Sequence, residues 1–87
     1  MVKYSIYTEN KNLNKTITLL SDTLPSGYTL NKTVGYWQGQ KEKSIKIEIL
    51  LVTPNTRKIK KLCDQIKTQN NQQSILLTTE RIKTSFI

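Results

Sequence analysis

The chain has 87 residues and a formal net charge of +8, from 14 Lys and Arg against 6 Asp and Glu. Its length predicts one domain over residues 1–87, and its 36% hydrophobic and 23% charged residues are typical of a globular protein rather than a disordered one. No apolar run approaches the ~18 residues of a membrane span, no signal peptide is recognisable, and the single cysteine excludes an internal disulfide. We therefore expect a cytoplasmic protein with no membrane contact.

The positive charge has two readings. It favours encounters with anions such as nucleic acid, nucleotides or acidic proteins. Alternatively it reflects only a composition rich in Lys, Asn, Thr and Ile, because 12 of the 14 basic residues are Lys. Both readings stay open at this point.

The first half of the chain predicts a strand, a helix and a second strand. Residues 2–8 alternate between apolar and polar side chains, which is typical of a half-buried strand. Asn10 or Asn12 then offers an N-cap, and Gly27 with the residues before it ends the helix. The apolar stripe of this helix consists of Leu13, Ile17, Leu20 and Leu24. Residues 28–37 alternate again and predict the second strand.

The second half predicts a strand, a helix and a final strand. Residues 45–52 form the most regular alternating run, and Asn55 or Thr56 caps the helix that follows. The apolar stripe of this helix consists of Ile59, Leu62, Cys63 and Ile66. Residues 74–80 predict the last strand, which residues 81–87 extend or follow as a tail.

The predicted order is β-α-β-β-α-β, the order of an α+β ferredoxin-like sandwich. Right-handed crossovers place both helices on one face of an antiparallel sheet. The opposite face is expected to carry an apolar set that suits burial by other copies of the chain. This set consists of Tyr7, Trp37, Leu50, Val52 and Leu76. We therefore expect a homo-oligomer.

The hairpin between the second and third strands carries a resemblance to a known group. Tyr36-Trp37-Gln38-Gly39 is followed by Glu42, Ser44 and Ile47-Glu48-Ile49, and residues 66–77 pass from a helix end through a polar turn into an apolar strand. In these features and in element order the chain resembles the small PII/CutA-like proteins. The resemblance implies a homotrimer or larger homo-oligomer with ligands held in clefts between subunits. The hairpin is far shorter than a PII T-loop, and the chain has no recognisable PII nucleotide motif.

The sequence offers little for catalysis, so we predict a protein that is not an enzyme. It has no His, and Cys63 lies on an apolar helical stripe, where a buried thiol is favoured over a nucleophile. The six Asp and Glu, at positions 9, 22, 42, 48, 64 and 80, show no metal-ligand spacing. We expect no metal and no cofactor.

The sequence contains several residues that are suited to binding a nucleotide. Tyr36 and Trp37 suit stacking on a nucleotide ring, although Trp37 alternatively packs under a neighbouring subunit. Phosphates would be held by Lys41 and Lys43, or by Arg57 and Arg81 if folding brings them near.

Two functions follow from these residues. The leading prediction is an oligomer that holds a small anionic ligand between subunits, namely a nucleotide or a nucleotide-derived signal. Such a protein would suit a phage or mobile element that captures a host defence signal. The alternative is a nucleic-acid- or protein-binding inhibitor module that acts through the basic face of the second helix, Lys58, Lys60 and Lys61, unless that face is only solvated. A structural oligomer without a ligand is a third possibility.

Overall fold

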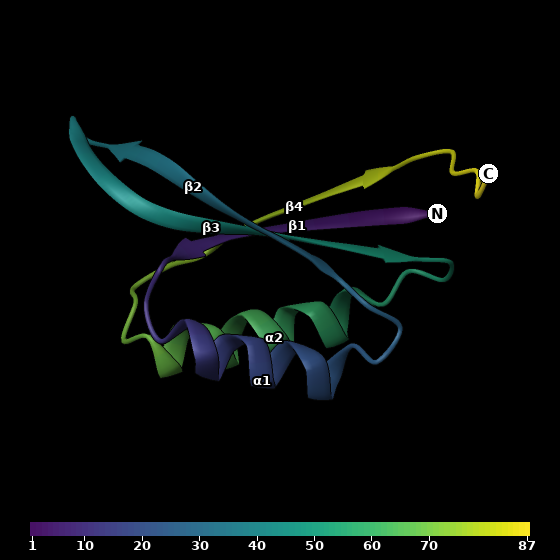
Figure 1. The fold of residues 1–87 in the computed structure, drawn as a ribbon, viewed down its shortest axis with the longest axis horizontal. Helices are drawn as coiled ribbons and strands as arrows, with labels where there is room; N and C mark the ends of the chain where they lie inside the picture. Colours follow the sequence, from purple (N-terminus) through teal and green to yellow (C-terminus); the bar gives the residue numbers. More distant parts are fainter.

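The computed structural model describes all residues, Met1–Ile87. The elements are β1 (Val2–Glu9), α1 (Leu13–Thr23), β2 (Thr29–Trp37), β3 (Gln40–Leu51), α2 (Thr56–Gln69) and β4 (Leu76–Arg81). The four strands form one antiparallel sheet in the order β2-β3-β1-β4, and both helices lie against the same face of it (Figure 1). This arrangement confirms the predicted ferredoxin-like β-α-β-β-α-β fold. Neither helix is long and apolar enough to cross a membrane.

The core lies between the sheet and the two helices. Alternate residues of the central strands point toward the helices, as the period of two requires, and meet the apolar stripes of α1 and α2. The buried set is Val2, Tyr4, Ile6, Leu20, Leu24, Ile45, Ile47, Ile49, Ile59, Leu62 and Ile66. Each Leu or Ile buried in this way stabilises the fold by about 1.5–3 kcal/mol.

Tyr4 fixes the start of α2 to the sheet. Its ring is fully buried, and its hydroxyl accepts a hydrogen bond from the Asn55 backbone N–H at 3.1 Å. The same hydroxyl lies 3.0 Å from Thr56 Oγ1. Asn55 is the N-cap, as predicted, because its side chain accepts from the Lys58 N–H.

The apolar stripe of α1 differs from the predicted one at one position. Ile17 is 39% exposed, and Thr16 is buried in its place. The Thr16 hydroxyl can be buried because it accepts a hydrogen bond from Gln69 Nε2. Asn12 occupies the N-cap position, but its side chain bonds to α2 rather than to the first turn of α1.

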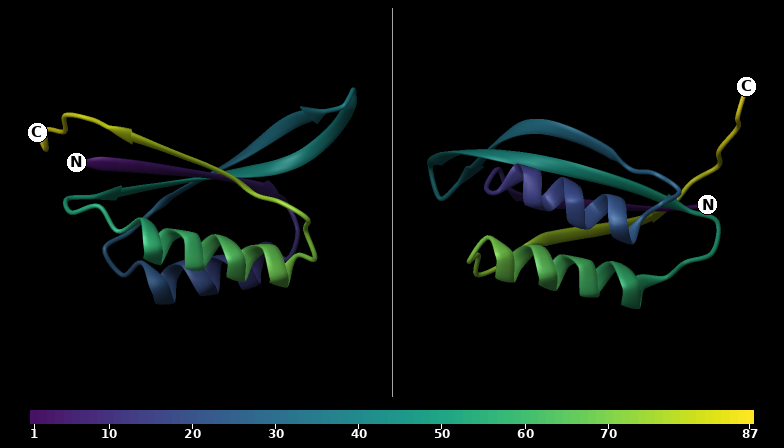
Figure 2. Two further views of the ribbon diagram at one scale, coloured as in Figure 1. Left: turned by 180° about the vertical axis from the view of Figure 1, so that it is seen from behind. Right: turned by 60° about the horizontal axis from the view of Figure 1, so that its bottom comes forward.

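The hairpin formed by β2 and β3 projects beyond the rest of the sheet. Gln38 and Gly39 both have positive φ, at 50° and 77°, which is the geometry of a two-residue hairpin turn of the type favoured by strand twist. The last pair between β1 and β3 is Glu9 with Ser44, and the Asn10 N–H donates to the Lys43 carbonyl just beyond it, so the strand pairs of residues 34–43 are only with each other. Figures 1 and 2 show this end of the hairpin rising away from the helices.

The helix-free face of the sheet is less apolar than we predicted. Leu50 and Leu76 are about half exposed there, and Val52 lies just past the end of β3. Between them runs a charged group in which Lys3 Nζ lies 3.8 Å from Glu48 and 3.5 Å from Glu80. The apolar side chains therefore lie toward the ends of this face, and its middle carries compensated charges.

Candidate functional site

A cleft of about 620 Å³ lies on the helix-free face, where the hairpin separates from the rest of the sheet. Its walls are the end of β1, one face of the hairpin from Ser44 at the base to Trp37 beside the turn, and the segment of residues 71–76 that leads into β4. Tyr7, Glu9, Trp37, Glu42, Ser44 and Gln72 are among the lining residues, and no Lys or Arg is among them. The lining residues are therefore acidic and aromatic, but two lysines stand beside them: Lys11 Nζ lies 2.7 Å from Glu9 Oε2, and Lys46 Nζ lies 5.7 Å from the centroid of the Tyr7 ring.

Trp37 lies across its own strand toward Gly35. A Cβ placed on Gly35 would be only 3.0 Å from Trp37 Nε1, so the indole occupies the space that any other residue at position 35 would need. The ring remains 55% exposed, which leaves it free to stack on a ligand. Gly35 thus serves this site by allowing the indole to lie close to the strand.

Glu9 and Glu42 form a pair of carboxyl groups in the cleft. The strand registers bring them together, since Glu9 faces Ser44 and Glu42 faces Gly35 on the same side of the sheet. Burial raises the pKa of Glu42, and the neighbouring carboxyl group of Glu9 raises that pKa further. The pKa of Glu9 is lowered, chiefly by its hydrogen bond to Lys11, whose Nζ lies 2.7 Å from Glu9 Oε2. Lys11 therefore keeps Glu9 charged, and Glu42 is the member of the pair that holds a proton more tightly than an ordinary Glu.

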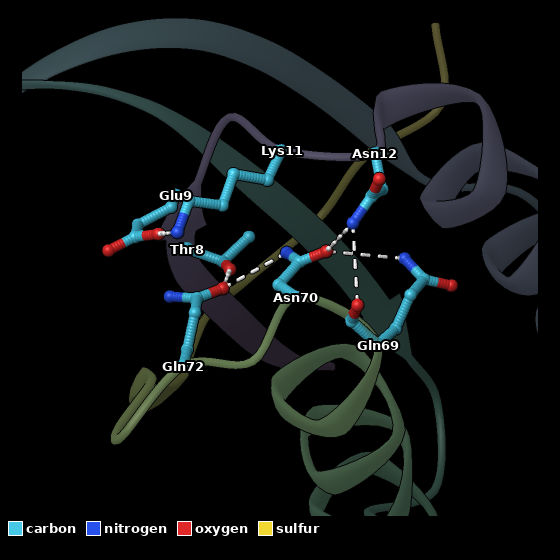
Figure 3. A network of polar contacts seen from close by, with 7 residues as sticks. All are labelled: Thr8, Glu9, Lys11, Asn12, Gln69, Asn70 and Gln72. Carbon is cyan, nitrogen blue, oxygen red and sulfur yellow. Dashed lines mark hydrogen bonds and ion pairs between the residues drawn. The ribbon is translucent and has the colours of Figure 1, made fainter.

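A network of side-chain amides holds the far wall of the cleft (Figure 3). Gln72 Oε1 accepts hydrogen bonds from Thr8 Oγ1 and from Asn70 Nδ2. Asn70 Oδ1 in turn accepts from Asn12 Nδ2 and from Gln69 Nε2. The network joins β1, the start of α1 and the end of α2, so the segment before β4 is fixed by side chains as well as by backbone.

The structure separates the predicted ligand residues of the hairpin. Trp37 lines the cleft. Tyr36, Lys41 and Lys43 lie on the opposite face of the same hairpin, because neighbouring residues of a strand point to opposite sides. Trp37 and Tyr36 therefore cannot stack on the same ring within one chain.

The remaining predicted residues lie at the other end of the molecule. Arg57 is in the first turn of α2, and the end of α2 that reaches the cleft is roughly 20 Å further along the helix axis. Lys58, Lys60 and Lys61 lie in the same turns as Arg57 and are exposed. Arg81 pairs with Val2, at the end of β4 farthest from the cleft. One chain alone does not bring Arg57 or Arg81 to Trp37.

Glu9, Glu42 and Gln72 were absent from the sequence-based set. The acidic residues look scattered along the chain because the sheet, and not sequence spacing, brings Glu9 and Glu42 together. A signal did exist: assigning the two-residue turn at Gln38-Gly39 fixes the register and places Glu42 opposite Gly35. Gln72 follows a helix end and has no comparable signal.

No model of a known protein family matches the chain, and no curated protein matches it. Solved structures do match. A phage SAM lyase in its apo state has a TM-score of 0.73 at 13% identity, over 91% of this chain and 78% of the other. A DUF3240 family protein from Shewanella baltica has a TM-score of 0.70 at 14% identity, over 99% and 93%. CPII, a nitrogen regulatory PII-like protein from Thiomonas intermedia bound to ADP, AMP and bicarbonate, has a TM-score of 0.66 at 16% identity, over 99% and 93%.

These similarities define a PII-like ferredoxin fold, as the sequence resemblance implied. They also contradict the prediction that the chain is not an enzyme, because a lyase has the same fold. That prediction is wrong. It depended on the absence of His, of a catalytic partner for Cys63 and of a metal-ligand spacing, and these are features of particular catalytic sites rather than requirements of every enzyme.

Proposed function

We propose that the cleft binds a positively charged adenine nucleoside, with S-adenosylmethionine as the ligand that suits it best, and that the protein cleaves this ligand. The observation that carries the proposal is the lining of the cleft, which combines two carboxyl groups with aromatic rings and contains no Lys or Arg. Such a lining favours a cation over a phosphate. The similarity of fold to a phage SAM lyase supports the same ligand.

The two walls of the cleft would hold different parts of the ligand. The exposed indole of Trp37 is placed to stack on adenine. Glu9 and Glu42 are placed to accept hydrogen bonds from ribose hydroxyls or from the ligand's ammonium group. Cleavage of a sulfonium consumes the positive charge on sulfur, so a carboxylate beside the sulfur would stabilise the substrate more than the transition state. We therefore assign the carboxyl groups to the ribose and ammonium and not to the sulfur.

We further propose that the protein is a homo-oligomer, with three copies as the arrangement that the PII/CutA-like resemblance implies, and that it is cytoplasmic. Trp37, Leu50 and Leu76 are 55%, 43% and 47% exposed on the helix-free face, and a second copy on this face would cover them. The cleft would then lie at or near a boundary between subunits. Size-exclusion chromatography with light scattering measures the number of copies directly.

A fluorescence titration tests the proposed ligand, because Trp37 is the only tryptophan. S-adenosylmethionine should change the emission at saturation and bind more tightly than 5′-methylthioadenosine, which keeps the adenine and the ribose but lacks the ammonium group. The cleavage would break the bond between the sulfur and Cγ of the methionine part. The bonding electrons return to the sulfur, and the ligand's own carboxylate closes on Cγ to form homoserine lactone. Chromatography of the same mixture should therefore show 5′-methylthioadenosine and homoserine lactone in equal amounts, and the Glu42→Gln variant should bind less tightly. Absence of binding and of product with wild-type protein would refute the proposal.

A second candidate is capture of an adenine nucleotide, which is the anionic ligand predicted from the sequence. It is favoured by the exposed ring of Trp37 and by the fold of CPII, a protein that was solved with ADP and AMP. In an oligomer a second copy would have to supply the phosphate contacts, for which Lys41, Lys43, Arg57 and Arg81 remain the predicted residues. Capture of a host signal by a phage protein would be one use of such a site. In the titration above, ADP binding without S-adenosylmethionine binding would select this candidate.

The basic start of α2 carries the third candidate, an inhibitor module for nucleic acid or protein. Arg57, Lys58, Lys60 and Lys61 are exposed, and none forms an ion pair within the chain. Reversing the charges of Lys58, Lys60 and Lys61 should then abolish binding of the partner and leave the cleft unchanged.

A further inference from the structure

The hairpin has two faces of opposite chemistry. Trp37 and Glu42 point toward the cleft. The other side carries three lysines, a tyrosine and a valine, which we call the basic face of the hairpin: Lys32, Val34, Tyr36, Lys41 and Lys43. No acidic residue interrupts it, because Glu42 points the other way.

The basic face is free of partners within the chain. Tyr36 is 69% exposed and Val34 52% exposed, and all three lysines are exposed. The ion pairs of the chain use Lys3, Lys11 and Lys46 only. Four of the five residues lie on the part of the hairpin that projects past β1 (Figure 2), and Lys32 lies next to that part, opposite Ile45.

The register alternates charge and apolar surface across this face. Tyr36 is directly opposite Lys41, and Val34 is directly opposite Lys43. Opposite side chains in an antiparallel pair are roughly 5 Å apart, and successive side chains on one face of a strand are roughly 7 Å apart. Lys41 therefore lies across from Tyr36, and Lys43 lies diagonal to it.

We propose that the basic face of the hairpin binds single-stranded nucleic acid. The lysines would contact successive phosphates, and the ring of Tyr36 would stack on a base. A stacking ring beside a row of positive charges is the combination by which proteins hold single strands without reading their sequence. An exposed ring needs an unpaired base to stack on, and this favours a single strand over a duplex.

This surface is distinct from the cleft and from the start of α2. The cleft ligand would contact Trp37 and Glu42 on the other side of the hairpin, and the basic turns of α2 lie at the far end of the molecule. The inference therefore goes beyond the proposed function, and either can fail without the other.

Fluorescence anisotropy with a labelled oligothymidine of roughly 15 nucleotides tests the proposal, because one small binding domain covers a strand of that order. Three lysine contacts predict a slope of about −2 in a plot of log affinity against log salt concentration, from about −0.7 for each contact. The Lys41→Gln/Lys43→Gln variant should lower the slope to about −0.7. Tyr36→Ala should weaken binding by roughly 5- to 160-fold, the loss of one stacked base.

The matched control is Lys60→Gln/Lys61→Gln, which removes the same charge from α2. It should leave the slope close to the wild-type value. The proposal is overturned if the oligothymidine does not bind at low salt, if a duplex of equal length binds more tightly, or if the α2 variant loses binding while the hairpin variant keeps it.

Discussion

Adding one methyl group at Gly35 should weaken ligand binding and leave the free energy of unfolding almost unchanged. In Gly35→Ala the new Cβ would lie 3.0 Å from Trp37 Nε1, several tenths of an ångström inside an ordinary contact. The strand backbone is held by its pairing with Glu42, whereas the indole is half exposed and can swing outward. We therefore expect the indole to move and the strand to stay.

The magnitudes follow from these two responses. Replacing Gly by Ala at a compatible backbone position stabilises a protein by about 0.4–1 kcal/mol through the unfolded state. Moving the indole off its preferred rotamer costs about 0.5–1.5 kcal/mol. The stability of Gly35→Ala should therefore stay within about 1 kcal/mol of wild type, whereas a ligand stacked on Trp37 loses up to about 1–3 kcal/mol of binding free energy.

Gly39→Ala is the matched control because it makes the same chemical change at the turn of the same hairpin. A Cβ at Gly39 meets nothing within 4 Å, but its φ of 77° is unfavourable for alanine by about 1–2 kcal/mol. Thermal melts should show a Tm lowered by at least about 4 °C in Gly39→Ala and little changed in Gly35→Ala. Emission of the only tryptophan should change in Gly35→Ala alone. Unchanged emission and unchanged ligand affinity in Gly35→Ala would show that Trp37 does not depend on Gly35.

Three further predictions concern single side chains. The pKa of Glu42 is raised in the folded state, so its proton contributes stability below the ordinary pKa of Glu, and this contribution is lost as the pH rises through the raised pKa. Affinity for a cationic ligand should rise over the same interval, and Glu42→Gln should flatten both pH profiles, of Tm and of affinity. Tyr4→Phe removes the buried hydroxyl that accepts from the Asn55 N–H and should cost about 1–3 kcal/mol in urea unfolding; a loss below a few tenths would contradict that role. Burial raises the pKa of Cys63 to about 11, so a thiol reagent near pH 7 should react on the order of a hundredfold more slowly with folded than with urea-unfolded protein; equal rates would contradict its burial.

The fold was accessible from the sequence because its signals are local. The alternation of residues 45–52, the stripe of α2 and the cap at Asn55 each depend on neighbours a few positions away. The error at Ile17 has a different origin. The burial of Thr16 depends on Gln69, 53 residues further on, and no periodicity within α1 contains that information.

The cleft depends on contacts between residues that are far apart in the sequence. Glu9 and Glu42 lie on different strands, and Gln72 is held by Thr8 across the fold. Trp37 was identified because it is a rare residue, but its partners were sought among neighbouring lysines that the strand places on the opposite face. Trp37 and the lysines can be picked out from the sequence, but the side of the hairpin to which each one points can be assigned only when the strand register is known.

The net charge of the whole chain does not predict the charge of the ligand that the cleft favours. A net charge of +8 governs how the molecule encounters anions at distances of about a Debye length, where individual side chains are averaged. Inside a cleft the nearest groups decide, and here they are Glu9 and Glu42, with one compensating lysine at Glu9. A basic molecule with an acidic cleft can attract one kind of partner to its surface and hold another in its site. The hairpin has an acidic side and a basic side within ten residues, because Lys41 and Lys43 flank Glu42 in the sequence and point to the opposite face.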